Sequence, residues 1–366
     1  MKTYKIQNIE TKTEYNAIDL VKFICALLVV SIHVSPFGTT DNEILRLFNY
    51  GIQNWLSRIA VPLFFASSGF LLYRKSSLDN FSLEQTKLYV IKLTKLYVIW
   101  TLIYCPFNIK SILVSEKGII LGILAYCRNI VFAGSYTHLW YFPALIFSVI
   151  VISYLLSRKI SLRKIVMVAL CFYVVGLLAE SWFGIIKPLY FNAPKLWFLL
   201  KVVKNIIYST RDGLFEGFLF VGMGATVAFY GFKLPQRKAL IGFCISYFFM
   251  FIEALGLKYF DFVRAWDMYV FLVPLTWFAF GLIVNCRIPC NSDIFKTLRI
   301  LSSLIFYIHM WIRCIISKFF TIIIGFDIDK TCFLFILTVS VSIAVAYMIY
   351  KISNYKQFNW LRKLYS

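Results

Sequence analysis

The sequence contains only three histidines, His33, His138 and His309. A neutral imidazole is the side chain best suited to take a proton from a hydroxyl group near neutral pH. We therefore expect His33 to act as a general base, with His138 and His309 as further catalytic candidates. The competing interpretation is a packed histidine in an apolar helix, which is the more common case for any one of them. No two of the three are four residues apart, so the pattern does not favour a metal site.

A lysine precedes the first histidine by eleven residues, and both belong to one apolar stretch from Ala17 to Pro36. Eleven residues make almost three turns of an α-helix, so Lys22 and His33 are predicted to share one face, ~16 Å apart along the axis. Polar side chains inside a membrane are costly and therefore suggest a function. The alternative for Lys22 is an ion pair with Asp19, which stands three residues earlier.

Four cations are candidates for binding an anionic cofactor: Lys22, Arg74, Lys92 and Lys95. Lys92 and Lys95 are three residues apart and so share a helical face. Such a group suits phosphates, which bind where several cations line one wall. For Arg74, which is followed by Lys75, the ordinary basic flank of a membrane span is the better interpretation.

One carboxylate, Glu216, stands where an apolar run begins after Gly213. If it is buried there, it could orient a histidine cation or bind a hydroxyl group of a substrate. It could equally form an ion pair with Arg211 at the edge of the membrane. The sequence leaves both interpretations open.

The composition indicates the kind of element that must position these side chains. The chain has 366 residues, of which 60% are hydrophobic and 15% charged, and its mean hydropathy is +0.77. Soluble proteins are only about half apolar, so we expect an integral membrane protein. The net charge of +21 does not indicate nucleic-acid binding, because the basic residues bracket apolar runs. The expected partner is the lipid bilayer with its anionic headgroups.

The apolar runs predict an all-α, polytopic membrane helix bundle of about ten transmembrane helices. The expected spans are Ala17 to Pro36, Leu56 to Tyr73, Tyr89 to Phe107, Leu139 to Leu156, Ile165 to Trp182, Leu214 to Tyr230, Ala239 to Leu257, Met268 to Val284, Ile300 to Phe320 and Cys332 to Tyr350. The basic doublets of the loops fall on one side if both the N- and C-termini are cytoplasmic. Residues 118–133 then form a re-entrant or external segment, because one more crossing would move the basic cluster at 158–164 outside. A short stretch from Leu196 to Tyr208 is interrupted by lysines and is not counted.

We expect one membrane domain over residues 1–366, with its core at about 16–351, because no repeat or long polar appendage divides the chain. Small residues such as Gly217, Gly222 and Gly224 should allow close contacts between helices. The nine cysteines are scattered and fit small core residues better than a disulfide framework or a zinc site. In this topology the histidines lie in the outer half of the membrane and the candidate cations lie at the inner side.

Several motifs together resemble those of acyltransferase family 3, the bacterial integral membrane acyltransferases. This family includes surface-polysaccharide O-acetyltransferases and the membrane half of vancomycin-resistance serine racemases. Lys22 and His33 stand where the family has an arginine, ten further residues and a histidine. The other motifs that carry the resemblance are Pro62 to Leu72, Lys92 with Lys95, Ser135 to Phe142, Gly213 to Phe218 and Ser302 to His309.

The resemblance implies an acyltransferase of the bacterial cytoplasmic membrane that transfers groups other than aminoacyl groups. Its donor would be cytoplasmic acyl-CoA, commonly acetyl-CoA, and no cofactor would be bound permanently. The acceptor would be a hydroxyl of a cell-surface glycan or glycolipid outside the cell, with Ser68, Trp140 and Tyr141 as substrate-binding candidates. Lysines replace the family's arginines at the three donor positions, so point charges take the place of bidentate phosphate contacts.

Two other functions remain open at this stage. A membrane transporter of a small amino acid such as serine would also need polar residues inside the membrane, and Glu216 and His309 would suit a zwitterion. Against transport, the sequence shows no pair of broken helices in equivalent positions of two halves. The third function is that of a noncatalytic assembly partner.

Overall fold

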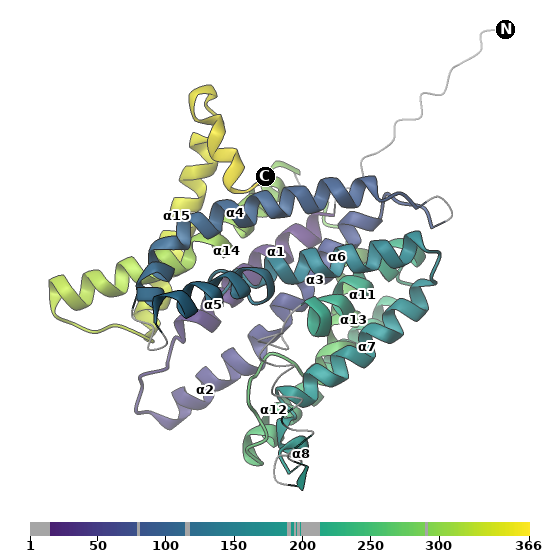
Figure 1. Cartoon of the computed structure of the whole chain (residues 1–366), viewed down its shortest axis with the longest axis horizontal. Helices are drawn as coiled ribbons and strands as arrows, with labels where there is room; N and C mark the ends of the chain where they lie inside the picture. Colours follow the sequence, from purple (N-terminus) through teal and green to yellow (C-terminus); the bar gives the residue numbers. More distant parts are fainter. Residues whose placement is uncertain are drawn as a thin grey trace.

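The computed structural model describes residues 15–78, 81–113, 118–188, 213–289 and 292–366, together with positions 192, 193, 195 and 198. Every regular element within these residues is helical, as expected (Figure 1). The elements are α1 Asn16–Val34, α2 Glu43–Asn54, η1 Leu56–Ile59, α3 Ala60–Tyr73, α4 Glu84–Leu113, α5 Ile119–Phe132, α6 Tyr141–Ser157, α7 Leu162–Ala179, α8 Phe183–Ile186, η2 Gly213–Gly217, α11 Phe218–Tyr230, α12 Gln236–Tyr259, α13 Leu272–Asn285, α14 Ser292–Lys318, η3 Phe319–Ile324, α15 Cys332–Ile352 and η4 Lys356–Leu364.

Eight helical segments in the described part of the chain are long and apolar enough to cross a membrane. They are Asn16–Val34, Glu43–Tyr73, Glu84–Ile109, Leu162–Ala179, Gly213–Tyr230, Gln236–Tyr259, Asp293–Ile324 and Cys332–Ile352. Two further expected spans form the shorter apolar helices α6 and α13, and α5 is a third short apolar helix. The polytopic helical class is thus confirmed, whereas the number ten and the orientation of the termini stay predictions.

Several expected boundaries were wrong, and two of them have identifiable reasons. The second span was expected to begin at Leu56, but helical structure begins at Glu43, because α2 and η1 lead into α3. Asn42 caps α2 by accepting hydrogen bonds from the backbone N–H groups of Ile44 and Leu45. The eighth span was expected from Met268, but α13 begins at Leu272, since the residues before it form a braced loop.

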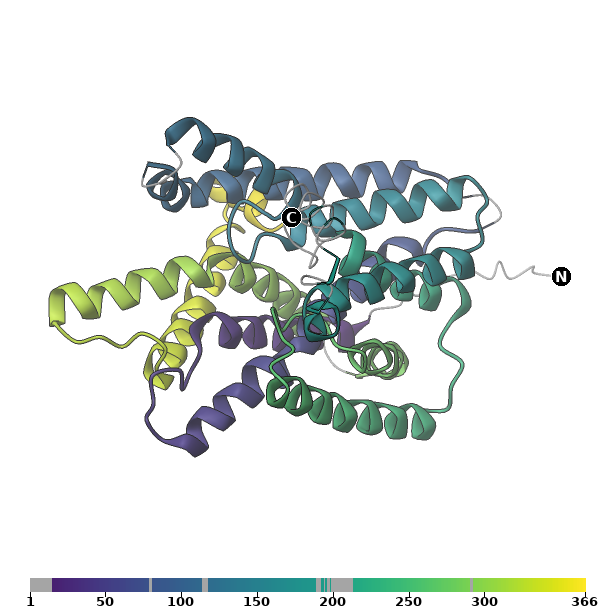
Figure 2. The same ribbon diagram turned by 60° about the horizontal axis from the view of Figure 1, so that its bottom comes forward.

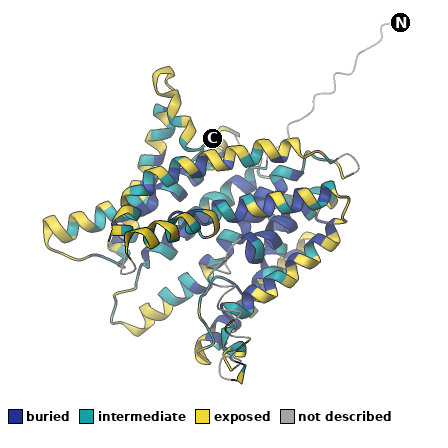
Figure 3. Ribbon diagram, viewed as in Figure 1, coloured by how far each residue is buried: buried dark blue, intermediate teal, exposed yellow. Residues whose placement is uncertain are grey.

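The centre of the bundle is formed by α1, α3, α11 and α14, with α1 packed against both α14 and α3. Figure 3 shows the buried residues gathered in these helices. In the turned view of Figure 2, α4 and α12 lie on opposite sides of this centre. Their outward side chains are large and apolar, including Leu102 of α4 and Phe248 of α12, both more than half exposed. Such surfaces fit contact with lipid tails.

The closest helix contact joins α3 to α11 and depends on glycine. A Cβ atom on Gly224 would collide with the carbonyl oxygen of Ala66, and one on Gly69 would collide with that of Val221. Gly217 also packs tightly, because a Cβ atom there would lie 2.6 Å from the hydroxyl of Ser148. The expected role of small residues is therefore confirmed for Gly217 and Gly224. Gly222 has more room, since the nearest atom, on Val166, would be 3.3 Å away.

Helix α1 defines two ends of the bundle, which we call the lysine end, near Lys22, and the histidine end, near His33. The helix stops just beyond His33 because Ser35 adopts a left-handed conformation, with φ of 60°, and is followed by Pro36. The Ser31 hydroxyl lies 2.9 Å from that of Ser57 and ties this last turn to η1. His33 is thus fixed at a helix end rather than in mid-helix.

Candidate active site

The structure brings the three histidines together at the histidine end. The ring centroid of His33 lies 5.3 Å from that of His309 and 6.3 Å from that of His138, and the last two are 4.9 Å apart. They come from the end of α1, the turn before α6 and the middle of α14. His138 and His309 are fully buried. Within the described residues, no group of three or more His, Cys, Asp or Glu side chains is arranged to hold a metal ion.

The surroundings of His309 select one tautomer. Its Nδ1 lies 3.1 Å from the carbonyl oxygen of Ile305, one turn earlier in α14. A carbonyl oxygen can only accept a hydrogen bond, so Nδ1 carries the proton and a neutral ring leaves Nε2 with a lone pair. Among the described residues, Nε2 has no hydrogen-bond partner. A buried nitrogen lone pair beside His33 is a group that can receive a proton.

His138 lies in the turn before α6 and is held as a neutral ring. Burial is the main effect that lowers its pKa well below the usual value of 6.5, and the neighbouring His309 and His33 lower it further. Contact with the backbone of Tyr307 opposes this effect. The ring of Tyr104 packs edge-on at 5.0 Å between centroids. His138 is therefore an uncharged member of the cluster near neutral pH.

A small cavity of about 50 Å³ opens beside the histidines. His33 and His138 line it, whereas His309 stands behind them against both rings. The predicted substrate-binding residues Trp140 and Tyr141 also line it. The complete lining is Val29, Ile32, His33, Ser57, Arg58, Val61, His138, Trp140, Tyr141, Glu216, Asp267 and Phe306.

Glu216 reaches the cavity from the π-helical turn η2 and is 2% exposed. This turn is pressed against α6, because the Ser148 hydroxyl donates a 2.9 Å hydrogen bond to the carbonyl oxygen of Gly213. The position fits the first interpretation of Glu216, a carboxylate beside the histidines. Arg211, its alternative partner, lies outside the described residues.

Two charged residues of the cavity wall were missed by the sequence reasoning. Arg58 and Asp267 form an ion pair with 2.6 Å between Nη1 and Oδ1. Their side chains are 13% and 18% exposed, so the pair is largely withdrawn from solvent. A signal was present, because opposite charges stand at or just before the first residues of two predicted spans. Nothing in hydrophobic periodicity, however, indicates that these two span ends meet.

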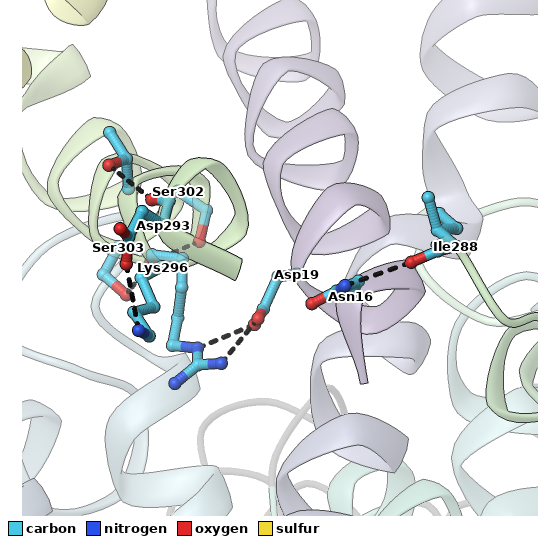
Figure 4. A network of polar contacts seen from close by, with 9 residues as sticks. Asn16, Asp19, Ile288, Asp293, Lys296, Ser302 and Ser303 are labelled. Atoms are coloured by element: carbon cyan, nitrogen blue, oxygen red, sulfur yellow. Dashed lines mark hydrogen bonds and ion pairs between the residues drawn. The ribbon is translucent and has the colours of Figure 1, made fainter. Parts of the chain in front are cut away.

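The lysine end has a different partner for Asp19 than the sequence suggested. Arg299 of α14 donates two hydrogen bonds to the Asp19 carboxylate, from Nε at 2.8 Å and from Nη2 at 2.6 Å (Figure 4). Lys22 lies within electrostatic range of Asp19, Arg299 and Lys92. The hydrogen-bonded partner of Asp19 is therefore Arg299 rather than Lys22. Arg299 is also a further cation at this end, which the sequence did not reveal.

The other predicted cations at the lysine end are less enclosed. Lys92 and Lys95 of α4 are both exposed. The Arg74 guanidinium lies over the ring of Tyr15, 4.9 Å from its centroid, and is half-buried. A cation–π contact of this kind fits an ordinary helix flank as well as a binding role. The structure therefore groups Lys22 with Lys92 more firmly than with Arg74 or Lys95.

Hydroxyl groups connect the two ends through the middle of the bundle. Ser68, the remaining predicted substrate-binding residue, does not line the cavity, but its hydroxyl lies 3.0 Å from that of Tyr141, which does. Tyr89 of α4, one turn before Lys92, also forms a side-chain hydrogen bond with Ser68. Tyr89, Ser68 and Tyr141 thus form a polar row between the turn that carries Lys92 and the histidine cavity.

Helices α1 and α14 run in the same direction, because Asp19 meets Arg299 at one end and His33 meets His309 at the other. The model of the acyltransferase domain family matches residues 15–350, which include both ends. The chain belongs to acyltransferase family 3. The expected acyltransferase domain, of the class that moves groups other than aminoacyl groups, is thereby confirmed.

Similar proteins of this acyltransferase family come from enterococci. An amino-acid racemase of Enterococcus faecalis is 32% identical over 288 residues, which is 76% of this chain and 37% of the racemase. A second amino-acid racemase of that organism is 30% identical, over 81% of this chain and 42% of its own length. A serine/alanine racemase of Enterococcus gallinarum is 30% identical, over 73% and 37%. The chain thus spans less than half the length of these relatives. No solved structure matches it closely enough to be counted as similar.

Proposed function

We propose that this acyltransferase moves an acyl group, in the first instance acetyl, from cytoplasmic coenzyme A thioester to a hydroxyl of a glycan or glycolipid outside the bacterial cytoplasmic membrane. The observation that carries the proposal is the arrangement along α1, with cations at one end and three clustered histidines beside a cavity at the other. Family membership supports acyl transfer, whereas the donor, the acceptor and the orientation are parts of the proposal.

The lysine end supplies the charge that an anionic donor needs. Among the described residues, the charged groups that act on Lys22 are Arg299, Lys92 and Asp19, so three cations share one carboxylate there. Arg299 is 53% exposed and Lys92 is exposed, so both can reach a phosphate that arrives from water. In this proposal the nucleotide phosphates remain here, and the thioester extends along the Tyr89–Ser68–Tyr141 row.

The histidine end supplies the acid–base chemistry. His33 takes the proton from the acceptor hydroxyl while the oxygen attacks the thioester carbonyl carbon. The C–O bond forms, the C–S bond breaks, and the coenzyme A thiolate leaves and is protonated by the His33 cation. His309 steadies that cation through its Nε2 lone pair, and Glu216 offsets the transient positive charge.

Transport of an amino acid is the second candidate, favoured by the names of the relatives, which are amino-acid and serine/alanine racemases. A cavity that holds both a carboxylate and a guanidinium could receive a zwitterion. Transport would require no thioester. Uptake of labelled serine that survives loss of His33 would favour this candidate.

The proposed activity is tested with membranes that contain the full chain and labelled acetyl-CoA. We expect label in the glycan fraction, lost with His33→Ala and retained with Ile24→Ala, which removes a 46% exposed side chain from the same helix. Equal labelling in both variants would reject the catalytic role of His33. Absence of labelling in the unmodified protein would reject acyl transfer from this donor.

A further inference from the structure

The Arg58–Asp267 ion pair is part of the cavity wall, yet the reaction proposed above leaves it without a role. Both residues border the cavity together with His33, Glu216 and Trp140. An ion pair held within a membrane protein is costly to desolvate and can contribute little net stability. Its position in the wall of a site therefore calls for a ligand-based explanation.

The Arg58 guanidinium is fixed on three sides. Its Nε donates to the carbonyl oxygen of Gln53 at 2.7 Å, its Nη2 to the Asn54 side-chain oxygen at 3.1 Å, and its Nη1 to Asp267 at 2.6 Å. The Tyr269 hydroxyl in turn donates to the Asn54 carbonyl oxygen at 2.6 Å. The pair is thus held in place before any ligand arrives, as recognition groups should be.

The loop that carries Asp267 is held in place by hydrogen bonds to Glu253 of α12. Its carboxylate accepts hydrogen bonds from the backbone N–H groups of Val270 at 2.8 Å and Phe271 at 3.0 Å, and from the Trp182 indole at 2.7 Å. These bonds hold the two residues that immediately precede α13, which begins at Leu272. Asp267 therefore stands on a rigid support rather than on a free loop.

The size of the cavity limits what can enter it. A volume of about 50 Å³ corresponds to roughly three or four water-sized positions. A sugar ring is larger than this, whereas a hydroxymethyl group on a short arm fits. A hydroxyl on a one-carbon arm can therefore reach His33 while the ring of the acceptor stays at the mouth.

The charges of the wall favour a neutral polyol over an amino acid. Asp267 and Glu216 are two carboxylates, and Arg58, the cation among the lining residues, is already paired with Asp267. The carboxylate of an amino acid would have to compete for that guanidinium, whereas sugar hydroxyls can donate to both carboxylates. Trp140 adds an aromatic surface against which the apolar face of a sugar can pack.

We propose that Arg58 and Asp267 recognise the glycan acceptor, and that the acceptor hydroxyl that reacts is a primary hydroxyl on a one-carbon arm. This inference rests on the proposed acyl transfer and assigns two residues that determine its acceptor specificity. Asp267 accepts a hydrogen bond from a ring hydroxyl, and Arg58 fixes the Asp267 carboxylate. Neither residue takes part in the proton transfer.

The substrate class is tested with the full-length protein in lipid nanodiscs, labelled acetyl-CoA and defined acceptors. Methyl glucoside should be acetylated, and methyl 6-deoxyglucoside, which lacks the primary hydroxyl, should react at least tenfold more slowly. Equal rates would overturn the choice of a primary hydroxyl. Acetylation of serine in preference to methyl glucoside would overturn the choice of a carbohydrate.

The role of the pair is tested with Asp267→Asn, for which the chain offers a matched control. Arg313 and Asp329 form a similar partly exposed pair, with 2.7 Å between Nη2 and Oδ1, and neither lines the cavity. We expect Asp267→Asn to raise the acceptor KM at least tenfold and to leave the KM for acetyl-CoA unchanged, whereas Asp329→Asn changes neither. Equal effects of the two variants would overturn the recognition role.

A charge exchange separates recognition from folding. The double variant Arg58→Asp with Asp267→Arg keeps an ion pair. Its unfolding temperature should therefore be closer to that of the unmodified protein than the unfolding temperature of either single variant, while its acceptor KM stays high. Recovery of the acceptor KM would show a purely structural pair and overturn the inference. If instead the unmodified protein acetylates none of the acceptors and no membrane glycan, the proposed function itself has failed.

Discussion

The lysine end and the histidine end of α1 differ most in their access to water. At the lysine end the Arg299 side chain is 53% exposed, and Lys92 is exposed as well. At the histidine end His309 is 0%, His138 1% and Glu216 2% exposed, and His33 is half-buried in front of them. Exposed cations can exchange water for a charged ligand at little cost, whereas buried imidazoles act where water is excluded.

This difference in exposure to water suits the lysine end to donor binding and the histidine end to the chemical step. Charges that stay hydrated suit capture of a soluble anion but do little to alter a barrier, because water screens them. Groups buried with fixed partners, such as His309 on the Ile305 carbonyl, need little reorganisation during a reaction. Changes at the histidine end should therefore affect the rate, and changes at the lysine end should affect donor binding.

The largest effect is expected from His309→Gln, which removes the Nε2 lone pair. We expect kcat to fall by about 10²–10⁴-fold, the range for loss of an acid–base group, with the KM for acetyl-CoA unchanged. Ser303→Ala is the control, since it lies in the same helix and its hydroxyl bonds to the Arg299 carbonyl oxygen. A rise in donor KM without a fall in kcat would remove the distinction between the two ends.

The next largest effect should come from Gly224→Val, which acts on neither end directly. The added side chain would meet Ala66 and Phe70 of α3, so overpacking should cost about 1–3 kcal/mol of stability and lower the unfolding temperature. Gly256→Ala is the control, because nothing lies within 4 Å of a Cβ atom there. Equal unfolding temperatures for the two variants would show that the α3–α11 contact does not stabilise the helix bundle.

A smaller, selective effect is expected from Lys22→Ala. Loss of one cation should raise the KM for acetyl-CoA by about tenfold, equivalent to ~1.4 kcal/mol, with kcat little changed. Lys22→Arg should restore donor binding, and Lys351→Ala, which removes a lysine from the last turn of α15, should have no effect. A fall in kcat with unchanged KM would place Lys22 in the chemistry instead.

The smallest effect should appear in the dependence of stability on pH. Because the folded pKa of His138 lies well below 6.5, the unfolded chain takes up a proton first as the pH falls. Stability from this group is complete above 6.5 and declines below it. The unfolding temperature should therefore fall between pH 7.5 and 5.5, and His138→Gln should flatten that slope. An unchanged slope in the variant would assign the dependence to other groups.

The sequence predicted most of the membrane-spanning helices, because each of them requires a long apolar run. It also predicted that His33, His138 and His309 belong to one side, since hydropathy and basic flanks together set the order of crossings. The helical segment that leads through α2 and η1 into α3 was missed, because α2 is amphipathic and carries no long apolar run.

The missed site residues share one physical cause. Arg299 meets Asp19 across 280 positions of sequence, and Arg58 meets Asp267 across 209. Periodicity within one helix predicts which face a residue occupies, but it does not indicate which other helix packs on that face. Local spacing therefore suggested Asp19 as a partner of Lys22, whereas the fold gives its carboxylate to Arg299.

The central claim, that the two ends serve one reaction across the membrane, is tested most directly in sided proteoliposomes. Labelled acetyl-CoA is supplied at the face that carries the lysine end, and methyl glucoside is supplied only at the opposite face. Our account predicts acetylated glucoside on the acceptor side with the unmodified protein, and none with His33→Ala. Transfer that occurs only when donor and acceptor share one face would contradict it.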